Sequence, residues 1–448
     1  MLWSKQLGKT HIPERKNTAQ MSAVAMPTPK EVLIPMLQHI GAPATPIVKV
    51  GDLVKVGQKI GEAQGFVSSP VHASVSGKVT KIENHLRPDG KVVPAIRILS
   101  DGEMTVSETV LPPVVTDFDS FIAAIRESGL VGLGGAGFPT AVKLNALKGG
   151  TIDTIVVNCA ECEPYITSDA RTILDDFDYV TRGIDILLGH AVGEVKVIFA
   201  VEKNKPECID KLKAHYAESD KVTVQALPTK YPQGSEKVIV YNTLGRIIEE
   251  GKLPSDVGVV VINVTTLAFI AKYLETGMPL VEKTFTVDGS AVKNPMNVRG
   301  PIGTPIRDII EFVGGLTEEG GKVLYGGPMM GIAVSNIDEP LMKNNNAITC
   351  LSLKDSVEPP ITDCIHCGRC VEACPIFLDP TAFAGALTLE TREDRATTLM
   401  ALKVNLCMSC GCCSYVCPAN RPLVQNNTLG KIEVQTYKAH LASLGEGK

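Results

Sequence analysis

Hydrophobic and polar positions divide the chain into stretches with different periods. Between Glu31 and Ser100, short β-type runs alternate with glycine turns, which is typical of a compact β sandwich or barrel. The clearest runs are PIVKV (46–50), GKVTKI (77–82) and VVPAIRIL (92–99). Residues 1–30 carry scattered proline and charge and predict no regular element.

The middle of the chain alternates between helical and strand-like periods. Apolar residues at helical spacing predict a helix between Asp117 and Gly129, and a glycine-rich loop (VGLGGAGFPT) follows it. Strand, helix, strand, helix and strand are then expected at 151–158, 175–192, 196–202, 205–218 and 221–227. Val257–Val264 is a strand-sized apolar run. This alternation predicts an α/β domain with a largely parallel sheet.

Residues 295–350 combine a helical run, RDIIEFVGG, with β-type runs and predict a small α+β module. The fold class expected is therefore multidomain α/β and α+β. The predicted parts are an N-terminal extension (1–30), a β barrel-sandwich module (31–112), a Rossmann-like α/β domain (113–290), a β-grasp-like module (291–352), a helical cysteine-rich domain (353–430) and a polar tail (431–448).

Composition narrows the function classes. The chain has 448 residues, enough for about three domains. Its net charge is -5, which argues against a nucleic-acid binder driven by a basic field. No apolar run reaches the ~18 to 20 residues of a membrane helix, and the N-terminus lacks the apolar core of a signal peptide. We therefore expect a cytoplasmic chain without a transmembrane segment of its own.

Cysteine spacing indicates iron–sulfur chemistry. Nine of the 13 cysteines fall between 364 and 417, and the motif C-x2-C-x2-C-x3-C-P occurs there twice, which is the signature of a two-cluster ferredoxin. Because the cysteine before proline crosses to the other cluster, one [4Fe-4S] centre is assigned Cys364, Cys367, Cys370 and Cys417, and the second Cys407, Cys410, Cys413 and Cys374. Cys412 falls outside the spacing. The alternative is zinc, whose sites usually pair two C-x2-C units without the third cysteine.

The glycine loop has the pattern G-x-G-x-x-G, with glycines at 132, 134, 135 and 137. A helix precedes it instead of a strand, so the dinucleotide fingerprint is the wrong interpretation in detail. Its glycines still let backbone N–H groups approach a phosphate or a flat ring, and Lys143 lies near in sequence to neutralise charge. The alternative is a glycine-rich turn without a ligand.

Four segments resemble the NADH-binding flavoprotein subunit of respiratory complex I. They are SGLVGLGGAGFPTAVKL (128–144), NCAECEP (158–164), YPQGSEK (231–237) and VINVTT (261–266), in the family's order. The family holds FMN, and NADH over it. The resemblance implies that Gly132, Gly134, Gly135, Gly137 and Lys143 cradle FMN, that Asn158, Tyr231, Gly234 and Asn263 line the flavin, and that Phe138, Glu161, Glu163 and Glu236 lie on the cofactor or dinucleotide side.

Within that resemblance, Glu163 is the candidate catalytic residue. The chain departs from the family where Leu133 stands for an arginine, Ala160 for an aspartate and Ala146 for an aromatic residue, so flavin binding is better supported than the dinucleotide contacts. Cys159 and Cys162 form a C-x2-C inside the flavin segment, and a redox or metal role for this pair stays open.

The N-terminal module resembles a biotinyl/lipoyl-type barrel-sandwich. Its expected hairpin tip, GFVSSPVHAS (65–74), has no lysine to carry a swinging arm, so we expect docking or packing. His72 is expected to be structural.

The domain order and the segment VLIPMLQHIGAPATPIVKVGD (32–52) are similar to those of the C subunits of Rnf complexes. These belong to membrane-bound ferredoxin:NAD+ oxidoreductases that couple electron flow to Na+ or H+ translocation. The resemblance implies an oxidoreductase subunit with FMN, NAD(H) and two [4Fe-4S] clusters. It also implies a peripheral position on the cytoplasmic face of the membrane, beside other subunits that include a ferredoxin-like one.

Two other functions remain open. One is a cobalamin reductase of a diol-degrading microcompartment, which has a similar domain order. The stretch THIPERK (10–16), similar to the Rnf motif H-P-P-E-x-K, argues against it. The other is a non-catalytic electron-wire scaffold whose nucleotide site has decayed, an idea that Ala160 and Ala146 support.

Overall fold

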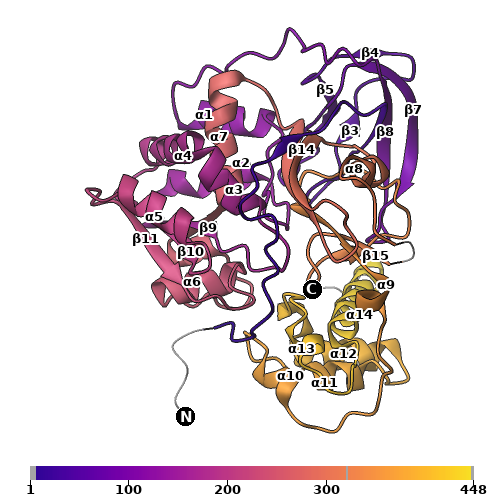
Figure 1. Ribbon diagram of the computed structural model, residues 1–448. Helices are drawn as coiled ribbons and strands as arrows, with labels where there is room; N and C mark the ends of the chain where they lie inside the picture. The colour runs from indigo at the N-terminus through magenta and orange to yellow at the C-terminus, as the bar shows by residue number, and fades with distance from the viewer. Residues whose placement is uncertain (1–6, 319–320, 445–448) are drawn as a thin grey trace. The chain divides into compact units, whose positions relative to one another are not determined.

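The protein is described from a computed structural model that covers residues 7–318 and 321–444. Its chain forms two compact units (Figure 1). The larger unit comprises residues 14–228 and 253–356. The smaller one joins residues 7–13, 229–252 and 357–444.

Two small antiparallel sheets form the N-terminal β module of the larger unit. Their strand orders are β2-β8-β7-β4 and β3-β5-β6. The strands are β2 (Glu31–Pro35), β3 (Thr45–Pro46), β4 (Leu53–Val54), β5 (Lys59–Glu62), β6 (Val71–His72), β7 (Gly77–Leu86) and β8 (Val92–Ser100). Alternate residues along them, such as Val32, Ile34, Ile96 and Ile98, are fully buried in one shared core. This period of two is why the segment folds as a half-buried sheet pair.

An open parallel sheet forms the centre of the larger unit, with the strand order β11-β10-β9-β12. The strands are β9 (Thr154–Cys159), β10 (Lys196–Glu202), β11 (Val222–Leu227) and β12 (Val259–Asn263). The helices around it are α1 (Phe118–Glu127), α2 (Thr140–Leu144), α3 (Ser168–Asp175), α4 (Phe177–His190), α5 (Pro206–His215) and α7 (Val264–Thr276), with short 3-10 turns η1 (Asn145–Gly149) and η2 (Pro254–Val257). β9 is buried almost throughout, as expected of a central parallel strand covered on both faces.

A six-stranded mixed sheet completes the larger unit, with the order β1-β14-β13-β17-β15-β16. Its strands are β1 (Val24–Ala25), β13 (Glu282–Asp288), β14 (Met296–Pro301), β15 (Lys322–Tyr325), β16 (Ile332–Ala333) and β17 (Ala347–Leu351), and α8 (Ile306–Phe312) and α9 (Leu353–Ser356) accompany it. The sheet already includes β13, ahead of the expected start at residue 291. Its edge strand β1 comes from the extension that was expected to be irregular, and it pairs in parallel with β14.

The smaller unit is helical. It contains α6 (Glu236–Leu244), α10 (Arg369–Glu372), α11 (Pro380–Ala386), α12 (Arg392–Ala401), η3 (Val404–Leu406), α13 (Cys412–Tyr415) and α14 (Leu423–Ser443). α14 runs through the boundary expected at residue 431, so the residues of the expected polar tail up to Ser443 are helical. Gly430 lies inside this helix, where an added Cβ would stand 3.1 Å from a methyl carbon of Leu399. The glycine therefore permits close helix packing and does not end the helix. Residues 445–448 of the expected tail lie outside the described residues.

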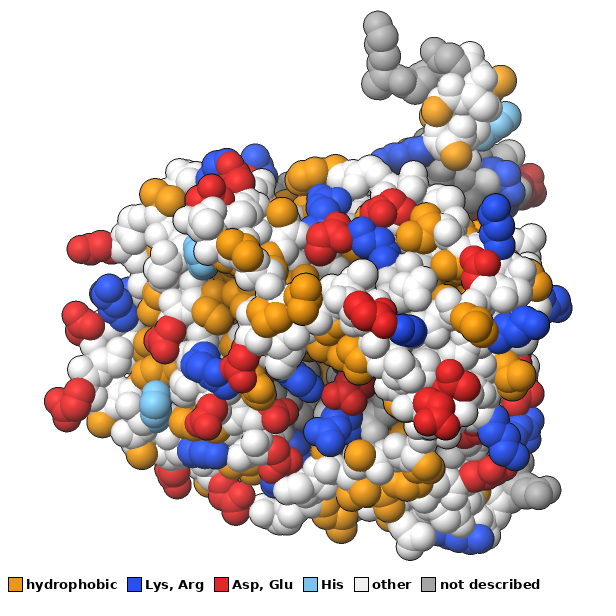
Figure 2. Space-filling model, turned by 90° about the horizontal axis from the view of Figure 1, so that it is seen from above, with side chains coloured by type: hydrophobic (Ala, Val, Ile, Leu, Met, Phe, Trp, Pro, Cys, Tyr) orange, Lys and Arg blue, Asp and Glu red, His pale blue; other side chains and the backbone are white. Residues whose placement is uncertain are grey.

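The surface carries both charge signs. Acidic and basic side chains are interspersed over the face shown in Figure 2, in agreement with the small net charge of -5. Within the described residues, no helix is both long and apolar enough to cross a membrane.

Candidate functional site

The parallel sheet has a point at which its strand order reverses. The chain runs outward from β9 to β10 and β11, then returns to β12 on the other side of β9. Ligands of open α/β sheets bind beyond the carboxyl ends of the strands at such a reversal. Asn263 ends β12 and Asn158 is the next-to-last residue of β9. The two are register partners, so the structure brings these two predicted flavin residues together.

The glycine loop lies against this strand end. Val131 and Pro139 pair as an isolated bridge, and the Gly132 N–H donates to the carbonyl of Phe138 at 2.8 Å, which closes the loop. Its tip, residues 134–136, is exposed. Gly134 packs on Asn263, because an added Cβ would stand 2.9 Å from the amide nitrogen of that side chain. Any larger residue at position 134 would displace the asparagine that ends β12.

Lys143 and Phe138 lie at the base of the loop, and both are partly buried. The Lys143 ammonium donates to the carbonyl of Val261 in β12 at 2.9 Å. The side chain of Leu133, which stands where the family has an arginine, is buried in the core of the sheet domain. Leu133 therefore packs the loop onto the apolar core of the sheet domain.

Glu161 and Asp169 form an acidic pair beneath the strand ends. The Glu161 carboxylate accepts from the backbone N–H groups of Asp169 (2.6 Å) and Ala170 (3.4 Å) at the start of α3. It thereby satisfies N–H groups that the helix leaves open. The Asp169 carboxylate accepts from the Asn263 amide (2.7 Å) and the Thr265 hydroxyl (2.7 Å), and burial raises its pKa. The sequence analysis did not identify Asp169, because the periodicity of α3 does not reveal its contacts with Asn263 and Thr265.

Glu163 has both carboxylate oxygens engaged. They accept from the backbone N–H groups of Met329 (3.0 Å) and Met330 (2.8 Å) in the loop between β15 and β16. Burial raises the pKa of this carboxyl to about 7, although the two N–H groups act in the opposite direction. Glu163 therefore fastens a loop of the six-stranded sheet to the flavin segment.

Residues 14–22 of the N-terminal extension, here called the strap, bond to the segment that contains Glu161 and Glu163. The Lys16 ammonium donates to the carbonyls of Glu161 (2.8 Å), Glu163 (2.8 Å) and Ile166 (2.6 Å), and burial lowers its pKa to about 8. Sequence reasoning placed Lys16 only in a family motif and assigned it no contact.

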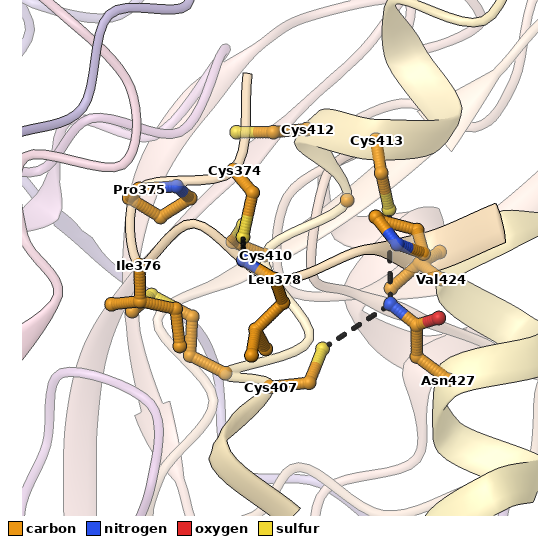
Figure 3. Close-up of a pocket in the computed structure, with 13 residues that line it drawn as sticks. Cys374, Pro375, Ile376, Leu378, Cys407, Cys410, Cys412, Cys413, Val424 and Asn427 are labelled. Carbon is orange, nitrogen blue, oxygen red and sulfur yellow. Dashed lines mark hydrogen bonds between the residues drawn. The ribbon is translucent and has the colours of Figure 1, made fainter. Parts of the chain in front are cut away.

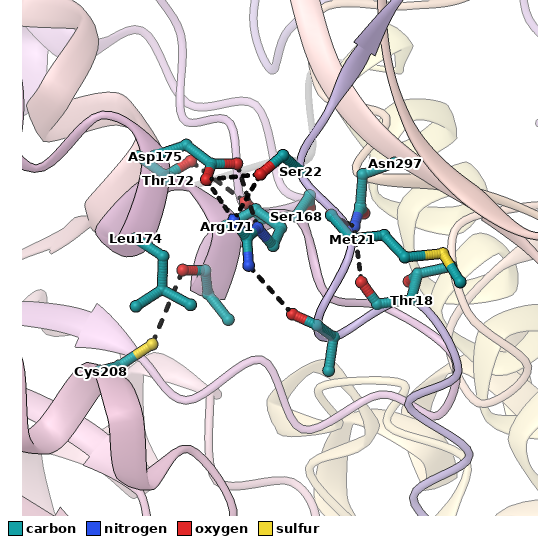
Figure 4. Close-up of polar contacts among 12 residues, drawn as sticks. Thr18, Met21, Ser22, Ser168, Arg171, Thr172, Leu174, Asp175, Cys208 and Asn297 are labelled. Carbon is teal, nitrogen blue, oxygen red and sulfur yellow. Dashed lines mark hydrogen bonds and ion pairs between the residues drawn. The ribbon is translucent and has the colours of Figure 1, made fainter.

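Further along the strap, Arg171 of α3 bonds to Asp175, to the Ser22 hydroxyl and to the Ala19 carbonyl (Figure 4). Asn297 of β14 donates to the carbonyls of Thr18 and Met21 at 3.0 Å each. The strap thus connects α3 to the six-stranded sheet.

Three predicted flavin residues belong to the smaller unit. Tyr231 is buried there, and its hydroxyl donates to the carbonyl of Cys410 at 2.7 Å. Gly234 is partly buried and Glu236 begins α6. These residues therefore share a unit with the candidate cluster cysteines, whereas the glycine loop and the two asparagines belong to the larger unit.

Two cavities in the smaller unit are lined by cysteines. The first cavity is surrounded by Cys374, Cys407, Cys410, Cys412 and Cys413 (Figure 3). The second is surrounded by Cys364, Cys367, Cys370 and Cys417. Each cavity thus gathers one of the two predicted ligand sets, including the crossed cysteine that precedes proline. Cys412, predicted not to be a ligand, is an additional lining residue of the first cavity.

The first cavity also directs N–H donors at sulfur. The Asn427 amide nitrogen lies 3.4 Å from the Cys407 sulfur and 3.9 Å from the Cys413 sulfur. The backbone N–H of Leu378 lies 3.3 Å from the Cys374 sulfur. Such donors favour thiolate ligands and tune cluster potential, so this donor set fits an iron–sulfur cluster.

The two cavities differ in exposure. Cys367 of the second cavity is exposed, whereas Cys410 and Cys413 of the first are buried. Among the described residues, no group of three or more His, Cys, Asp or Glu side chains could hold a single metal ion. Zinc would draw its sulfurs to about 2.3 Å from one point. The cysteines here surround a space instead, which suits a multi-atom cluster better.

Family models match four parts of the chain. The family model described as the Nuo51 FMN-binding domain matches residues 125–272, and that of the 4Fe-4S dicluster domain matches 360–421. The RnfC barrel sandwich hybrid domain matches 5–103 and the SLBB domain 284–333. The predicted cofactors FMN and 4Fe-4S are confirmed at this level, as is the multidomain organisation with mixed sheets and helices.

A solved structure shares the fold. The chain superposes on a chain of the NAD+-reducing [NiFe]-hydrogenase with a TM-score of 0.50 and 21% identity, over 70% of this chain and 61% of that one. At this identity the likeness concerns the fold alone.

Full-length relatives identify the family. The chain is 42% identical over 381 residues to the C subunit of the Na+-translocating ferredoxin:NAD+ oxidoreductase complex of Acetobacterium woodii, covering 84% of this chain and 86% of the relative. It is 41% identical to the C subunit of the proton-translocating complex of Clostridium ljungdahlii, covering 82% and 80%. It is 39% identical to the C subunit of the ion-translocating oxidoreductase complex of Rhodobacter capsulatus, covering 81% and 71%. The chain therefore belongs to the family of C subunits of the ion-translocating ferredoxin:NAD+ oxidoreductase (Rnf) complexes, as its sequence motifs predict.

Proposed function

We propose that this chain is the NAD(H)-binding electron-transfer subunit of an Rnf complex that couples electron flow to Na+ or H+ translocation. One observation carries the proposal. The chain combines a glycine loop at the reversal of a parallel sheet with two cavities that each gather four motif cysteines. The relatives, which are C subunits of ferredoxin:NAD+ oxidoreductase complexes, support it.

The larger unit supplies the flavin side. In this proposal the glycine loop, Lys143, Asn158 and Asn263 hold FMN at the carboxyl ends of β9 and β12. When bound, the flavin exchanges a hydride with NAD(H) and single electrons with iron–sulfur clusters. The protein residues hold the cofactor and set its electrostatics. The parallel strand order β11-β10-β9-β12 supports assigning this domain as Rossmann-like. The mixed order of the six-stranded sheet supports assigning that module as β-grasp-like.

The dinucleotide side is assigned by resemblance. We place three residues on this side: Phe138, Glu163 and Glu236. Glu236 is included because its segment, 231–237, resembles one of the family's segments. Glu163 is proposed to act there by holding the Met329–Met330 loop, since two backbone N–H groups occupy its oxygens. This assignment makes it a positioning group.

The smaller unit supplies the one-electron side. Cys364, Cys367, Cys370 and Cys417 are proposed to ligate one [4Fe-4S] cluster, and Cys374, Cys407, Cys410 and Cys413 the other. Tyr231 and Gly234, which by resemblance line the flavin, share this unit with the cysteines. Electrons would pass to or from other subunits, including a ferredoxin-like one, with the chain peripheral on the cytoplasmic face of the membrane.

Anaerobic reconstitution with iron, sulfide and FMN tests this proposal. We expect one FMN, about eight irons and bleaching of the flavin band when NADH is added. A flavin band that NADH leaves unchanged, with the iron still bound, would contradict the dehydrogenase function and favour the electron-wire scaffold. Reduction of a cobalamin by the NADH-reduced chain at a rate above that of free reduced flavin would instead favour the cobalamin reductase.

A further inference from the structure

Residues outside the glycine loop donate hydrogen bonds to the carbonyl of every second residue from Leu133 to Gly137. Three of its carbonyls each accept a hydrogen bond from a group beyond the loop. These bonds are Lys283 Nζ to Leu133 O (2.8 Å), Asn344 Nδ2 to Gly135 O (2.7 Å) and the Ile40 N–H to Gly137 O (3.1 Å). The regular spacing means that alternate peptide planes of the loop are fixed.

Fixing a carbonyl also fixes the next N–H. In a trans peptide the C=O of one residue and the N–H of the next point in opposite directions. Each external donor therefore turns the N–H group of the following residue (Gly134, Ala136 or Phe138) away from itself. These three N–H groups have no acceptor among the residues that the structure describes, and Gly134 and Ala136 are exposed. Backbone N–H groups that a loop leaves unbonded are the donors from which anion-binding concavities are built.

The donors come from the two modules that flank the sheet domain. Lys283 belongs to β13, and Asn344 precedes β17 in the same six-stranded module. Ile40 follows β2 in the N-terminal β module. Contact between these modules is close, since the Gln38 side chain accepts from the Lys343 N–H at 3.0 Å.

Lys283 is held rigidly. Its side chain is only 4% exposed, and its ammonium has Asp169 as its charged neighbour. Thr266 fixes the same peptide region, because its hydroxyl accepts from the Leu133 N–H at 2.9 Å. Both polar atoms of Leu133 are therefore satisfied from outside the loop, and this end of the loop is preorganised.

We propose that Lys283, Asn344 and the backbone of Ile40 are positioning groups that turn the loop N–H groups toward the cofactor phosphate. The N-terminal β module and the six-stranded module then have a role in the flavin site besides docking. This inference rests on the proposed FMN site.

Asn344→Leu in the full chain is the first test, because Asn344 is partly exposed and the change removes only the donor. FMN affinity is measured by quenching of flavin fluorescence, beside that of riboflavin, which lacks the phosphate. We expect the Kd for FMN to rise about two- to tenfold, the range of one hydrogen bond, with a smaller change for riboflavin. Asn346→Leu is the matched control, since no hydrogen bond joins its side chain to the loop in the described residues.

Lys283→Met should weaken FMN binding more than Asn344→Leu, because the donor it removes is buried and leaves the Leu133 carbonyl without a partner. Should it fail to fold, Asn344→Leu still decides. The thermal midpoint of the FMN-free Asn344→Leu protein should match that of Asn346→Leu, which separates positioning from general stability. Equal FMN affinities in these two variants would overturn the inference while leaving the proposed function intact. A wild-type chain that fails to bind FMN would refute the proposed function, and this inference with it.

Discussion

Three of the predicted cofactor residues accept hydrogen bonds from backbone N–H groups of the protein itself. Glu161 caps α3, Glu163 fastens the Met329–Met330 loop, and Asn263 caps α7 while donating to Asp169. The sequence predicted these residues by resemblance as cofactor contacts. It did not predict their hydrogen bonds, because the partners of Glu163 lie far along the chain and those of Glu161 and Asn263 depend on how α3 packs beside the strand ends.

The motif cysteines were the most predictable part of the site. Their spacing is a local property of the sequence, and each of the two sets of four that it predicts lines one cavity. The donor from Asn427 could not be foreseen, since it depends on where α14 passes the first cavity.

Asn427→Leu should lower the reduction potential of the cluster bound by Cys407 and Cys413. An N–H donor to sulfur stabilises the more negative, reduced cluster. One hydrogen bond of about 0.5–1.5 kcal/mol corresponds to roughly 20–60 mV for a one-electron couple. A redox titration followed by electron paramagnetic resonance measures it. Asn426→Leu, on the next residue of the same helix, serves as the control, and equal potentials in both variants would refute the role of Asn427.

Glu163 should make stability depend on pH. Burial raises the pKa of its carboxyl from 4.5 to about 7 in the folded protein. The folded state then binds the proton more tightly than the unfolded chain, so this stabilisation is present below about pH 4.5 and is lost as the pH rises through 7. The free energy of unfolding, relative to that of Glu163→Gln, should fall by roughly 3 kcal/mol over this range.

Urea unfolding of both proteins between pH 4.5 and 8 measures this difference. Glu194→Gln, at an exposed position of the same unit, is the matched control. A difference between wild type and Glu163→Gln that stays constant with pH would show that Glu163 is ionised at its ordinary pKa.

At the scale of elements, the N-terminal strap is the least expected feature. Residues 14–22 lack a hydrophobic period and were expected to be irregular, which is correct for their backbone. Their order comes from buried polar bonds to the 161–166 loop, to α3 and to the six-stranded sheet. Periodicity cannot reveal an element that is held by side-chain hydrogen bonds.

Lys16→Met should test the strap. Three carbonyls of the 161–166 loop would lose their donor, which should destabilise the larger unit by about 2–4 kcal/mol. Thermal unfolding and proteolysis of the intact chain measure this loss. Lys30→Met removes an exposed lysine of the same segment and should change neither. A Lys16→Met protein as stable as Lys30→Met would show that the strap contributes nothing.

At the scale of the whole molecule, the order of modules follows from the sequence, but their contact partners do not. Residues 229–252 lie within the range that matches the Nuo51 FMN-binding domain, yet they form one compact unit with the cysteine helices. Long-range contacts such as that of Tyr231 with Cys410 decide this grouping. Composition and local period contain no information on them.

The two cavities should release iron at different rates. Cys374→Ser leaves only the ligand set that includes exposed Cys367, and Cys364→Ser leaves only the set with buried Cys410 and Cys413. With an iron chelator in air, we expect the Cys374→Ser protein to lose its remaining iron faster. Release is followed by the absorbance of the chelated iron. Equal rates would contradict the difference in exposure.

Rapid mixing of the anaerobically reconstituted chain with NADH tests directly whether electrons pass from NADH through the flavin to the iron–sulfur clusters. The flavin band and the broad iron–sulfur band are followed together. We expect the flavin band to bleach first and part of the iron–sulfur band to follow, as electrons pass from the nucleotide to the clusters. Bound flavin that stays oxidised under excess NADH, in protein that retains both clusters, would contradict it.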